Sequence, residues 1–427
     1  MRTSQSTLKP ALWLITALIC ASSMQFYTAK IWSAGQPPQF SDLYAPWWGS
    51  HEVLLHGRNP YTPAVAHEIQ TVIYGSPVTA GNGADYNSLS GGFAYPLYVS
   101  FLLWPTVHLP FALAQSLFTW AAAALTLTGI LMWLRALQFR GPPIERTTVA
   151  LLALGNFPVL QGIHLQNLSL IAAALLTFSL VLLSRNHVTL AGFFLAASTF
   201  KPQFTVVVVP WLAVWTLTNW RQRKRLAWSF LASMCLLLVA SELLLPGWVR
   251  DFMKVVQAYT HYTFGRSLLD LWFTPSAGPF AAGGLLIAVL VLCWKFRRFG
   301  TDAPHQLLVV SVMLAATITV IPTLAPHTQL LLLPGLLCLY RYRLILWKSN
   351  QYARLSLVAL CLLLAWPWVA AILLAVGSVL FPMNALLRWW DLPLYTSPIL
   401  PLAVLLTLCC LIRIPISPGD TVPHFSR

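Results

Sequence analysis

Apolar residues run through this chain in long stretches, and short polar segments separate them. Most stretches approach the roughly twenty residues that an α-helix needs to cross the hydrocarbon core of a bilayer. The pattern therefore predicts an all-α, polytopic membrane protein with a single domain over residues 1–427 and a short tail at 415–427. We expect about twelve transmembrane helices, near residues 11–29, 94–136, 147–163, 167–184, 188–200, 203–219, 226–246, 276–294, 305–321, 328–345, 354–376 and 396–413.

Residues 94–136 are long enough for two crossings, with Pro105 and Pro110 near the middle. Two crossings would place the arginines that follow outside the cell, whereas one crossing places them inside. Because cytoplasmic loops carry an excess of Lys and Arg, we expect one crossing, preceded by a half-inserted or interfacial piece at 94–109. Both termini are then expected in the cytoplasm.

The longest polar segment, residues 31–93, follows the first apolar stretch and is expected on the outer face. Within it, aromatic and apolar side chains recur at spacings of three and four from Tyr44 to Leu55, which predicts a short helix lying at the membrane interface. Gly57 is expected to end this helix, since Gly readily adopts the left-handed conformation of a C-cap. The stretch Gly75–Gly92 is rich in Gly, Ser and Asn and is typical of a loop. A polar connection this long between spans usually carries function.

Composition and charge agree with a membrane protein. Of the 427 residues, 58% are hydrophobic and 9% are charged, against about 25% charged in a typical soluble domain. The formal net charge of +15 could suit nucleic acid, but the basic residues lie in short clusters between apolar stretches, which is the positive-inside pattern. We therefore expect the lipid bilayer as a partner and no nucleic acid. The seven cysteines have no metal-ligand spacing and predict neither a disulfide framework nor a metal site.

Asp42 stands where the first apolar stretch has ended and the interfacial helix is expected to begin. Asp is a preferred N-cap residue, and a cap contributes about 1 kcal/mol to stability. A helix N-terminus also favours the ionised carboxylate, and an ionised carboxylate can accept a proton from a hydroxyl group. The two interpretations are compatible, and the chemistry alone leaves both open.

Polar residues also stand between later spans, where contact with lipid would make them costly. In Gln161–Ser169, a His, two Gln and an Asn predict either a polar cavity or hydrogen bonds between helices. Lys201 stands at the outer end of a span, where it either reaches for the membrane surface or binds a lipid phosphate. His327 begins a later span and is either an interfacial residue or a phosphate ligand. The expected topology places all of them on the outer face with Asp42, so a reactive site is expected there.

Several of these segments, in matching order over roughly residues 40–345, resemble glycosyltransferase family 87, whose members are polytopic GT-C enzymes. Lys-Pro-Gln is the most specific of the shared motifs. The motifs are matched here by Asp42, Tyr44, Gly57-Arg58-Asn59-Pro60-Tyr61, Gly192 and Lys201-Pro202-Gln203.

Three further segments match the family less fully. Tyr95-Pro96-Leu97 stands where the family has Tyr-Pro-Pro, and Leu165-Gln166 stands where it has Gly-Gln. A Gly at position 165 would permit a closer backbone approach than Leu does. The segment Pro322–Gln329 resembles the family's His-containing loop before a late span.

The resemblance implies a GT-C fold and transfer of a hexose, chiefly mannose, from a polyprenyl-phosphate sugar donor to a glycan or glycolipid acceptor. It implies an inverting displacement on the outer, periplasmic side of the plasma (inner) membrane, with Asp42 as catalytic base. Lys201, with Arg58 or His327, would offset the charge of the leaving phosphate, so neither a metal nor a cofactor is expected in the transfer. The substrate-binding residues that it implies are Tyr44, Arg58, Asn59, Tyr61, Tyr95, Gln166, Lys201 and His327.

Two other functions fit parts of the pattern. A lipid-linked sugar transporter or flippase would share the spans and the outer basic groups, but it would not need a carboxylate beside the membrane. A ligase that moves a whole glycan would usually have a large outer loop late in the chain, whereas the largest one here comes first. The absence of an Asp-x-Asp motif argues against an enzyme that uses nucleotide sugars.

Overall fold

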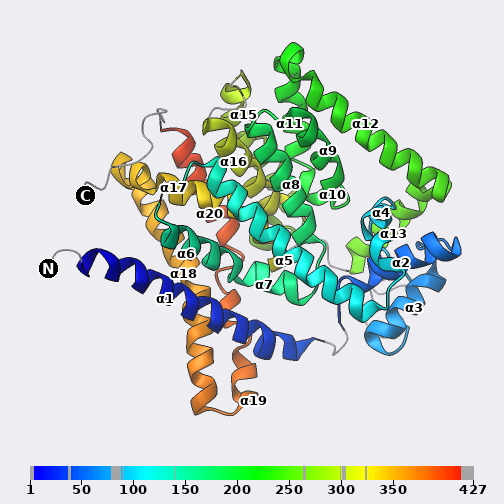
Figure 1. Ribbon diagram of the computed structural model, residues 1–427, viewed down its shortest axis with the longest axis horizontal. Coiled ribbons are helices and arrows are strands. Elements are labelled where there is room, and N and C mark those ends of the chain that lie inside the picture. The colour runs from blue at the N-terminus through cyan, green and yellow to red at the C-terminus, as the bar shows by residue number, and fades with distance from the viewer. Residues whose placement is uncertain are drawn as a thin grey trace.

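The structure is a computed structural model that describes residues 4–36, 40–77, 88–89, 91–139, 141–262, 266–298, 300, 304–322 and 325–414. Within these residues every regular element is a helix, which confirms the all-α class (Figure 1). The longer α-helices are α1 (Ser4–Phe26), α2 (Tyr44–His56), α3 (Pro63–Tyr74), α4 (Val99–Val107), α5 (Phe111–Ala136), α6 (Pro143–Leu154), α7 (Phe157–His164), α8 (Ser169–Ser184), α9 (Val188–Ser198), α11 (Val208–Thr218), α12 (Trp220–Leu244), α13 (Trp248–Tyr262), α15 (Gly278–Trp294), α16 (Pro304–Val320), α17 (Leu333–Ser349), α18 (Gln351–Leu380) and α20 (Leu400–Ile412). Short helical pieces between them include η1 (Tyr27–Trp32), α10 (Pro202–Thr205), α14 (Leu268–Trp272), η5 (Pro326–Leu332) and α19 (Met383–Leu386).

In the described part of the chain, six helical segments are long and apolar enough to cross a membrane. They have 21 to 30 residues, which corresponds to about 30–45 Å of helix and matches a hydrocarbon core of about 30 Å. The chain is therefore a membrane protein, as expected, while the count of twelve spans stays a prediction. The six segments are Pro10–Gly35, Phe111–Ala136, Trp220–Leu244, Gly278–Arg298, Pro326–Ser349 and Gln351–Leu380.

Several of the other expected spans are shorter or broken in the structure. The apolar helices α8, α9, α11, α16 and α20 have between 11 and 17 residues. The span expected at 147–163 is divided into α6 and α7, with Gly155 following α6 and Asn156 capping α7. Helices α8 and α16 are buried among their neighbours, and α8 has buried residues all around its axis. These two helices therefore pack inside the bundle, whereas α9, α11 and α20 each expose large apolar side chains.

Residues 94–136 divide where the two prolines predict. Helix α4 has nine residues and α5 has 26, and Pro110 immediately precedes α5. Nine residues span only about 13 Å, which is less than half of a hydrocarbon core. Helix α5 is long and apolar enough to cross a membrane, whereas α4 is not, and the single crossing with an interfacial piece at 94–109 stays a prediction.

The polar segment at residues 31–93, which we call the first outer loop after its expected place, forms two helices in its described residues. These helices, α2 and α3, lie with α4 and α13 at one end of the molecule (Figure 1). Gly57 ends α2 in the left-handed conformation, with φ of 64°, as its sequence position predicts. The aromatic face of α2 is covered by protein, because Tyr44 and Trp47 are buried and both contact the ring of Phe111 at the start of α5. The expected loop at Gly75–Gly92 lies mostly outside the described residues.

Helix α9 is held close to α12 by a glycine, and α9 leads directly to Lys201. A Cβ atom at Gly192 would lie 2.8 Å from the carbonyl oxygen of Leu226 and 2.8 Å from Cβ of Ser229. Because those atoms belong to α12, a larger residue at position 192 would push the two helices apart. Gly192 therefore positions the helix that precedes Lys201, one of the predicted site residues.

Candidate active site

A chain of hydrogen bonds joins Asp42 to Lys201 through Asn167. Nδ2 of Asn167 donates to Oδ2 of Asp42 at 2.6 Å, and Oδ1 of Asn167 accepts a hydrogen bond from Nζ of Lys201 at 2.7 Å. Lys201 also donates to the hydroxyl group of Ser169. A carboxylate and an ammonium group are thus held on either side of one neutral amide.

Three separate segments of the chain supply these groups. Asp42 precedes α2, Asn167 and Ser169 stand at the start of α8, and Lys201 directly precedes α10. The backbone N–H of Asp42 donates to the carbonyl of Leu165 at 2.8 Å, which fixes the first outer loop to the connection between α7 and α8. Oδ1 of Asn167 also accepts from the backbone N–H of Ser169 at 2.8 Å, so the amide group is fixed in one orientation.

Asp42 does not cap a helix, and the N-cap interpretation is wrong. Helix α2 begins two residues later, at Tyr44, and its N-cap residue is Leu43, which makes no side-chain cap bond. The hydroxyl of Ser41 accepts the backbone N–H of Leu43 at 3.2 Å instead. The carboxylate of Asp42 accepts a hydrogen bond from Asn167 and does not stabilise the start of α2.

Lys201 is buried, with a relative exposure of 6%, and the interpretation of a lysine reaching for the membrane surface is wrong. Burial lowers the pKa of its ammonium group to about 8, while the negative charge of Asp42 acts in the opposite direction. An amine in such a place keeps its charge only while a nearby anion favours it. Lys201 is therefore a cation that would gain from an additional anion.

The carboxyl of Asp42 lies in surroundings that make it a stronger proton acceptor than an ordinary aspartate. Burial raises its pKa, and the hydrogen bond from Asn167 and the charge of Lys201 lower it without cancelling the effect of burial. The phenol of Tyr95 is close enough to interact with this charge: burial raises the pKa of Tyr95 well above its usual value, and Asp42 adds to the shift. A catalytic base is favoured by a pKa raised toward the working pH.

His327 belongs to the same group of residues. Its side chain is buried, its backbone N–H donates to Oε1 of Gln161 at 2.8 Å, and the charge of Lys201 acts on its ring. Within the described residues, Nδ1 of His327 has no hydrogen-bond partner. The structure therefore brings Asp42, Tyr95, Lys201 and His327 near one another.

Arg58 lies elsewhere, in a group of ionic contacts that we call the acid–arginine cluster (Glu52, Arg58 and Glu68). Arg58 donates to Oε2 of Glu52 at 2.5 Å and to Oε1 of Glu68 at 2.6 Å. Trp48 donates its indole N–H to Oε2 of Glu68 at 2.9 Å. Because two carboxylates already compensate its charge, Arg58 is a poorer candidate than Lys201 for neutralising a leaving phosphate.

Four other residues of the expected site make contacts that hold the scaffold. Tyr44 packs in the aromatic group on α2, and Asn59 donates to Oδ2 of Asp251 on α13 at 2.9 Å. The hydroxyl of Tyr61 donates to the carbonyl of Tyr95 at 2.8 Å. Gln166 accepts a hydrogen bond from the side chain of Gln115 on α5 at 2.9 Å.

Leucine at position 165, where the family has glycine, does not strain the backbone. The positive φ of this segment, 51°, falls on Gln166 and not on Leu165. Leu165 offers its carbonyl to the N–H of Asp42, and this contact makes no demand on its side chain. The connection between α7 and α8 therefore keeps its place beside Asp42 with leucine at position 165.

Asn167, Ser169 and Gln161 are the site residues that sequence reasoning missed. The polar stretch Gln161–Ser169 predicts either a cavity or hydrogen bonds between helices, but the family resemblance points only to Gln166 within it. Asn167-Leu168-Ser169 also fits the Asn-x-Ser glycosylation pattern, although its two polar side chains point to Asp42 and Lys201. Their shared signal is an Asn and a Ser two residues apart at the start of an otherwise apolar helix.

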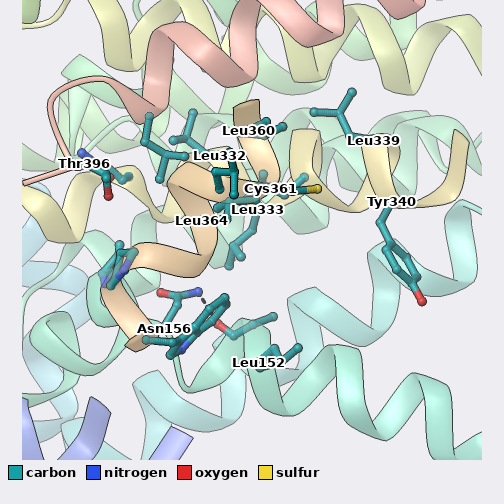
Figure 2. Close-up of a pocket in the computed structure, with 18 of the residues that line it drawn as sticks. Leu152, Asn156, Leu332, Leu333, Leu339, Tyr340, Leu360, Cys361, Leu364 and Thr396 are labelled. Carbon is teal, nitrogen blue, oxygen red and sulfur yellow. Dashed lines mark hydrogen bonds between the residues drawn. The ribbon is translucent and has the colours of Figure 1, made fainter. Parts of the chain in front are cut away.

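An apolar cavity of about 660 Å³ lies between α6, α17, α18 and the start of α20. Gln329, two residues after His327, lines it. In Figure 2, Asn156 and Thr396 lie toward one end of the cavity and Tyr340 lies at the other, with leucines between them. A space of this kind, apolar along its length and polar at its ends, fits a hydrocarbon chain.

The comparisons with known proteins concern the later part of the chain. The model of glycosyltransferase family 87 matches residues 93–367, which include Tyr95, Asn167, Lys201 and His327, whereas Asp42 lies outside the matched residues. No curated protein and no solved structure matches the chain.

Proposed function

Since the chain belongs to glycosyltransferase family 87 and is a membrane glycosyltransferase, we propose that it transfers a hexose, with mannose as the first candidate, from a polyprenyl-phosphate sugar to a glycan or glycolipid acceptor. The observation that carries this proposal is the carboxylate of Asp42 and the ammonium group of Lys201 on the two sides of Asn167. This arrangement offers a proton acceptor and a phosphate-binding cation within one site.

The transfer is a single displacement with inversion at the anomeric carbon. The acceptor oxygen forms a bond to that carbon, and the bond from the carbon to the phosphate oxygen breaks. The proton of the acceptor hydroxyl moves to the carboxylate of Asp42, and polyprenyl phosphate leaves with the bonding electron pair. The raised pKa of Asp42 favours this proton transfer.

Lys201 offsets the negative charge that grows on the leaving phosphate. Because the ammonium group is already fixed by Asn167 and Ser169, little reorganisation is needed at the moment of reaction. Nδ1 of His327, which lacks a partner among the described residues, supports a second contact to the phosphate. Arg58 is left out of this step, because Glu52 and Glu68 hold it.

The polyprenyl chain of the donor occupies the apolar cavity. Gln329 follows His327 closely and reaches the cavity wall, so a chain attached to a phosphate at Lys201 and His327 has a short path into it. This assignment is supported by the leucine lining and by the polar residues at the cavity ends (Figure 2).

The reaction takes place on the outer face of the plasma membrane. The four basic clusters between apolar helices support cytoplasmic loops at 137–146, 220–226, 295–304 and 341–354. Labelling of single-cysteine variants from outside tests this sidedness, after replacement of the native cysteines, of which Cys235 and Cys361 are exposed. Lys224 is a suitable reporter because it is exposed, whereas Arg223 is buried; labelling of Lys224→Cys from outside would overturn the sidedness.

Donor turnover by the purified protein tests the function itself. A radiolabelled polyprenyl-phosphate hexose is incubated with the wild-type protein and with Asp42→Asn, and released polyprenyl phosphate and labelled product are measured. We expect transfer by the wild type and transfer about 10²- to 10⁴-fold slower by Asp42→Asn. Equal transfer by both proteins would exclude Asp42 as the base, and donor transport without transfer would favour a flippase.

A further inference from the structure

Three side chains at the end of α2 converge as a set of metal ligands, apart from the proposed active site. Nδ1 of His51 lies 3.1 Å from Oε1 of Glu52, and Nδ1 of His56 lies 3.3 Å from the same oxygen. The three ligand atoms all lie within 4.8 Å of one another. We propose that His51, Glu52 and His56 bind one divalent transition-metal ion, with Zn²⁺ as the preferred ion.

The distances fit a tetrahedral ion. Zinc binds imidazole nitrogen and carboxylate oxygen at about 2.0–2.2 Å, which places neighbouring ligand atoms about 3.3 Å apart. Both distances to Oε1 of Glu52 already have this value within a few tenths of an ångström. A rotation of the His56 ring, whose side chain is 53% exposed, would bring the third pair closer and would leave the fourth position open to water.

The nature of the ligands selects the class of metal. Two imidazoles and one carboxylate suit zinc and its neighbours in the transition series, whereas calcium and magnesium prefer sites made of oxygen. The other carboxylate oxygen of Glu52 is held by Arg58 at 2.5 Å, an outer contact of the kind that orients a ligating carboxylate.

The charges near the site favour a cation. With neutral histidines, the acid–arginine cluster contains two carboxylates and one guanidinium group, so its net charge is −1. The side chain of Glu52 is only 3% exposed, so solvent compensates little of that charge. A bound cation would join the last turn of α2 to this cluster and would stabilise the turn that carries Asn59 and its bond to α13.

Zinc binding by the full-length protein in detergent tests the proposal. The protein is purified with a tag that contains no histidine, stripped with a chelator, and titrated with Zn²⁺ alone in a calorimeter. We expect one ion per chain, a higher unfolding temperature with zinc, and X-ray absorption with nitrogen and oxygen neighbours at about 2.0–2.1 Å. Mg²⁺ should not compete.

Single substitutions decide the location of the ion. His56→Ala and, independently, His51→Ala should each weaken zinc binding at least about tenfold and abolish the thermal shift. His67→Ala, on the neighbouring helix α3, is the matched control and should bind zinc as the wild type does. No binding by the wild type, or unchanged affinity in both His51→Ala and His56→Ala, would overturn the proposal. Because Asp42 and Lys201 lie outside this site, the result is independent of the transfer assay.

Discussion

Two carboxylates of the first outer loop, Asp42 and Glu52, stand ten positions apart in the sequence and have opposite environments. Glu52 is bonded directly to Arg58 at 2.5 Å. Asp42 is separated from its nearest cation, Lys201, by the side chain of Asn167. The charge of the Glu52 carboxylate is compensated by Arg58, whereas the carboxylate of Asp42 remains available to a substrate.

The difference shows how a protein can keep two opposite charges reactive in one place. A direct ion pair compensates both charges, so the guanidinium group of Arg58 has little charge left for a phosphate. A neutral amide between them donates to the anion and accepts from the cation, so each group is oriented while its charge is only partly compensated. This is the preorganisation that stabilises charge developing during a reaction.

The largest expected effect comes from removing the charge of Asp42. Asp42→Asn keeps the size of the side chain but removes the proton acceptor, so transfer should fall about 10²- to 10⁴-fold. Donor binding should stay near the wild-type value. Steady-state transfer and donor binding by the purified protein measure the two quantities.

Glu68→Gln is the matched control for Asp42→Asn. Glu68 lies in the same loop, is partly exposed and belongs to the acid–arginine cluster, so transfer should change little. Wild-type turnover by Asp42→Asn, or loss of folding without any other effect, would show that Asp42 is a structural residue. Its role would then be the same in kind as that of Glu52.

The next effect concerns the cation on the other side of Asn167. Lys201→Ala removes a buried charged contact to phosphate, and such contacts contribute about 1.5–3 kcal/mol, or roughly 10- to 100-fold in donor affinity. Lys201→Arg keeps the charge and should bind the donor more tightly than Lys201→Ala. Calorimetric titration with the donor measures this, and equal affinity in all three proteins would contradict a phosphate-binding role.

The pH dependence of kcat/KM should report the protonation of both Asp42 and Lys201, which lie on the two sides of the Asn167 amide. Asp42 acts as a base only when ionised, so kcat/KM should fall as the pH decreases through its raised pKa. Lys201 acts only when protonated, so kcat/KM should also fall as the pH rises through about 8. A profile of kcat/KM measures the free enzyme.

Lys201→Arg sharpens the pH experiment. Arginine stays protonated at every accessible pH, so the decrease on the alkaline side should disappear in this variant. A decrease near pH 8 that persists in Lys201→Arg would assign the alkaline limb to another group.

The smallest effect is expected in the acid–arginine cluster. Glu52 is buried beside Arg58, so a change to Gln should have a measurable effect on stability. Because Arg58 is itself 43% exposed, Glu52→Gln should lower the free energy of unfolding by only about 1–2 kcal/mol.

Thermal unfolding in metal-free buffer measures this change without any contribution from zinc. Glu68→Gln should lower the unfolding temperature less, since its carboxylate is 38% exposed. Equal stability of Glu52→Gln and the wild type would show that the direct ion pair contributes nothing measurable.

The sequence by itself determined the class of the protein and several local features. Apolar length and the clustering of basic residues predict a polytopic helical membrane protein, because crossing a bilayer requires long apolar helices whatever their neighbours are. Gly57 is identified as the end of α2, since the left-handed conformation is a local property of glycine. Asp42 and Lys201 are identified as candidates by their motifs and their position beside spans.

Only the tertiary structure decided which polar groups meet. Asn167 bonds to Asp42 from 125 positions away, and Lys201 is a further 34 positions along the chain. No local pattern reports such contacts, because they depend on how the connection between α7 and α8 meets both the first outer loop and the segment before α10. For the same reason Arg58 seemed a phosphate ligand in the sequence, while in the folded chain Glu52 and Glu68 hold it.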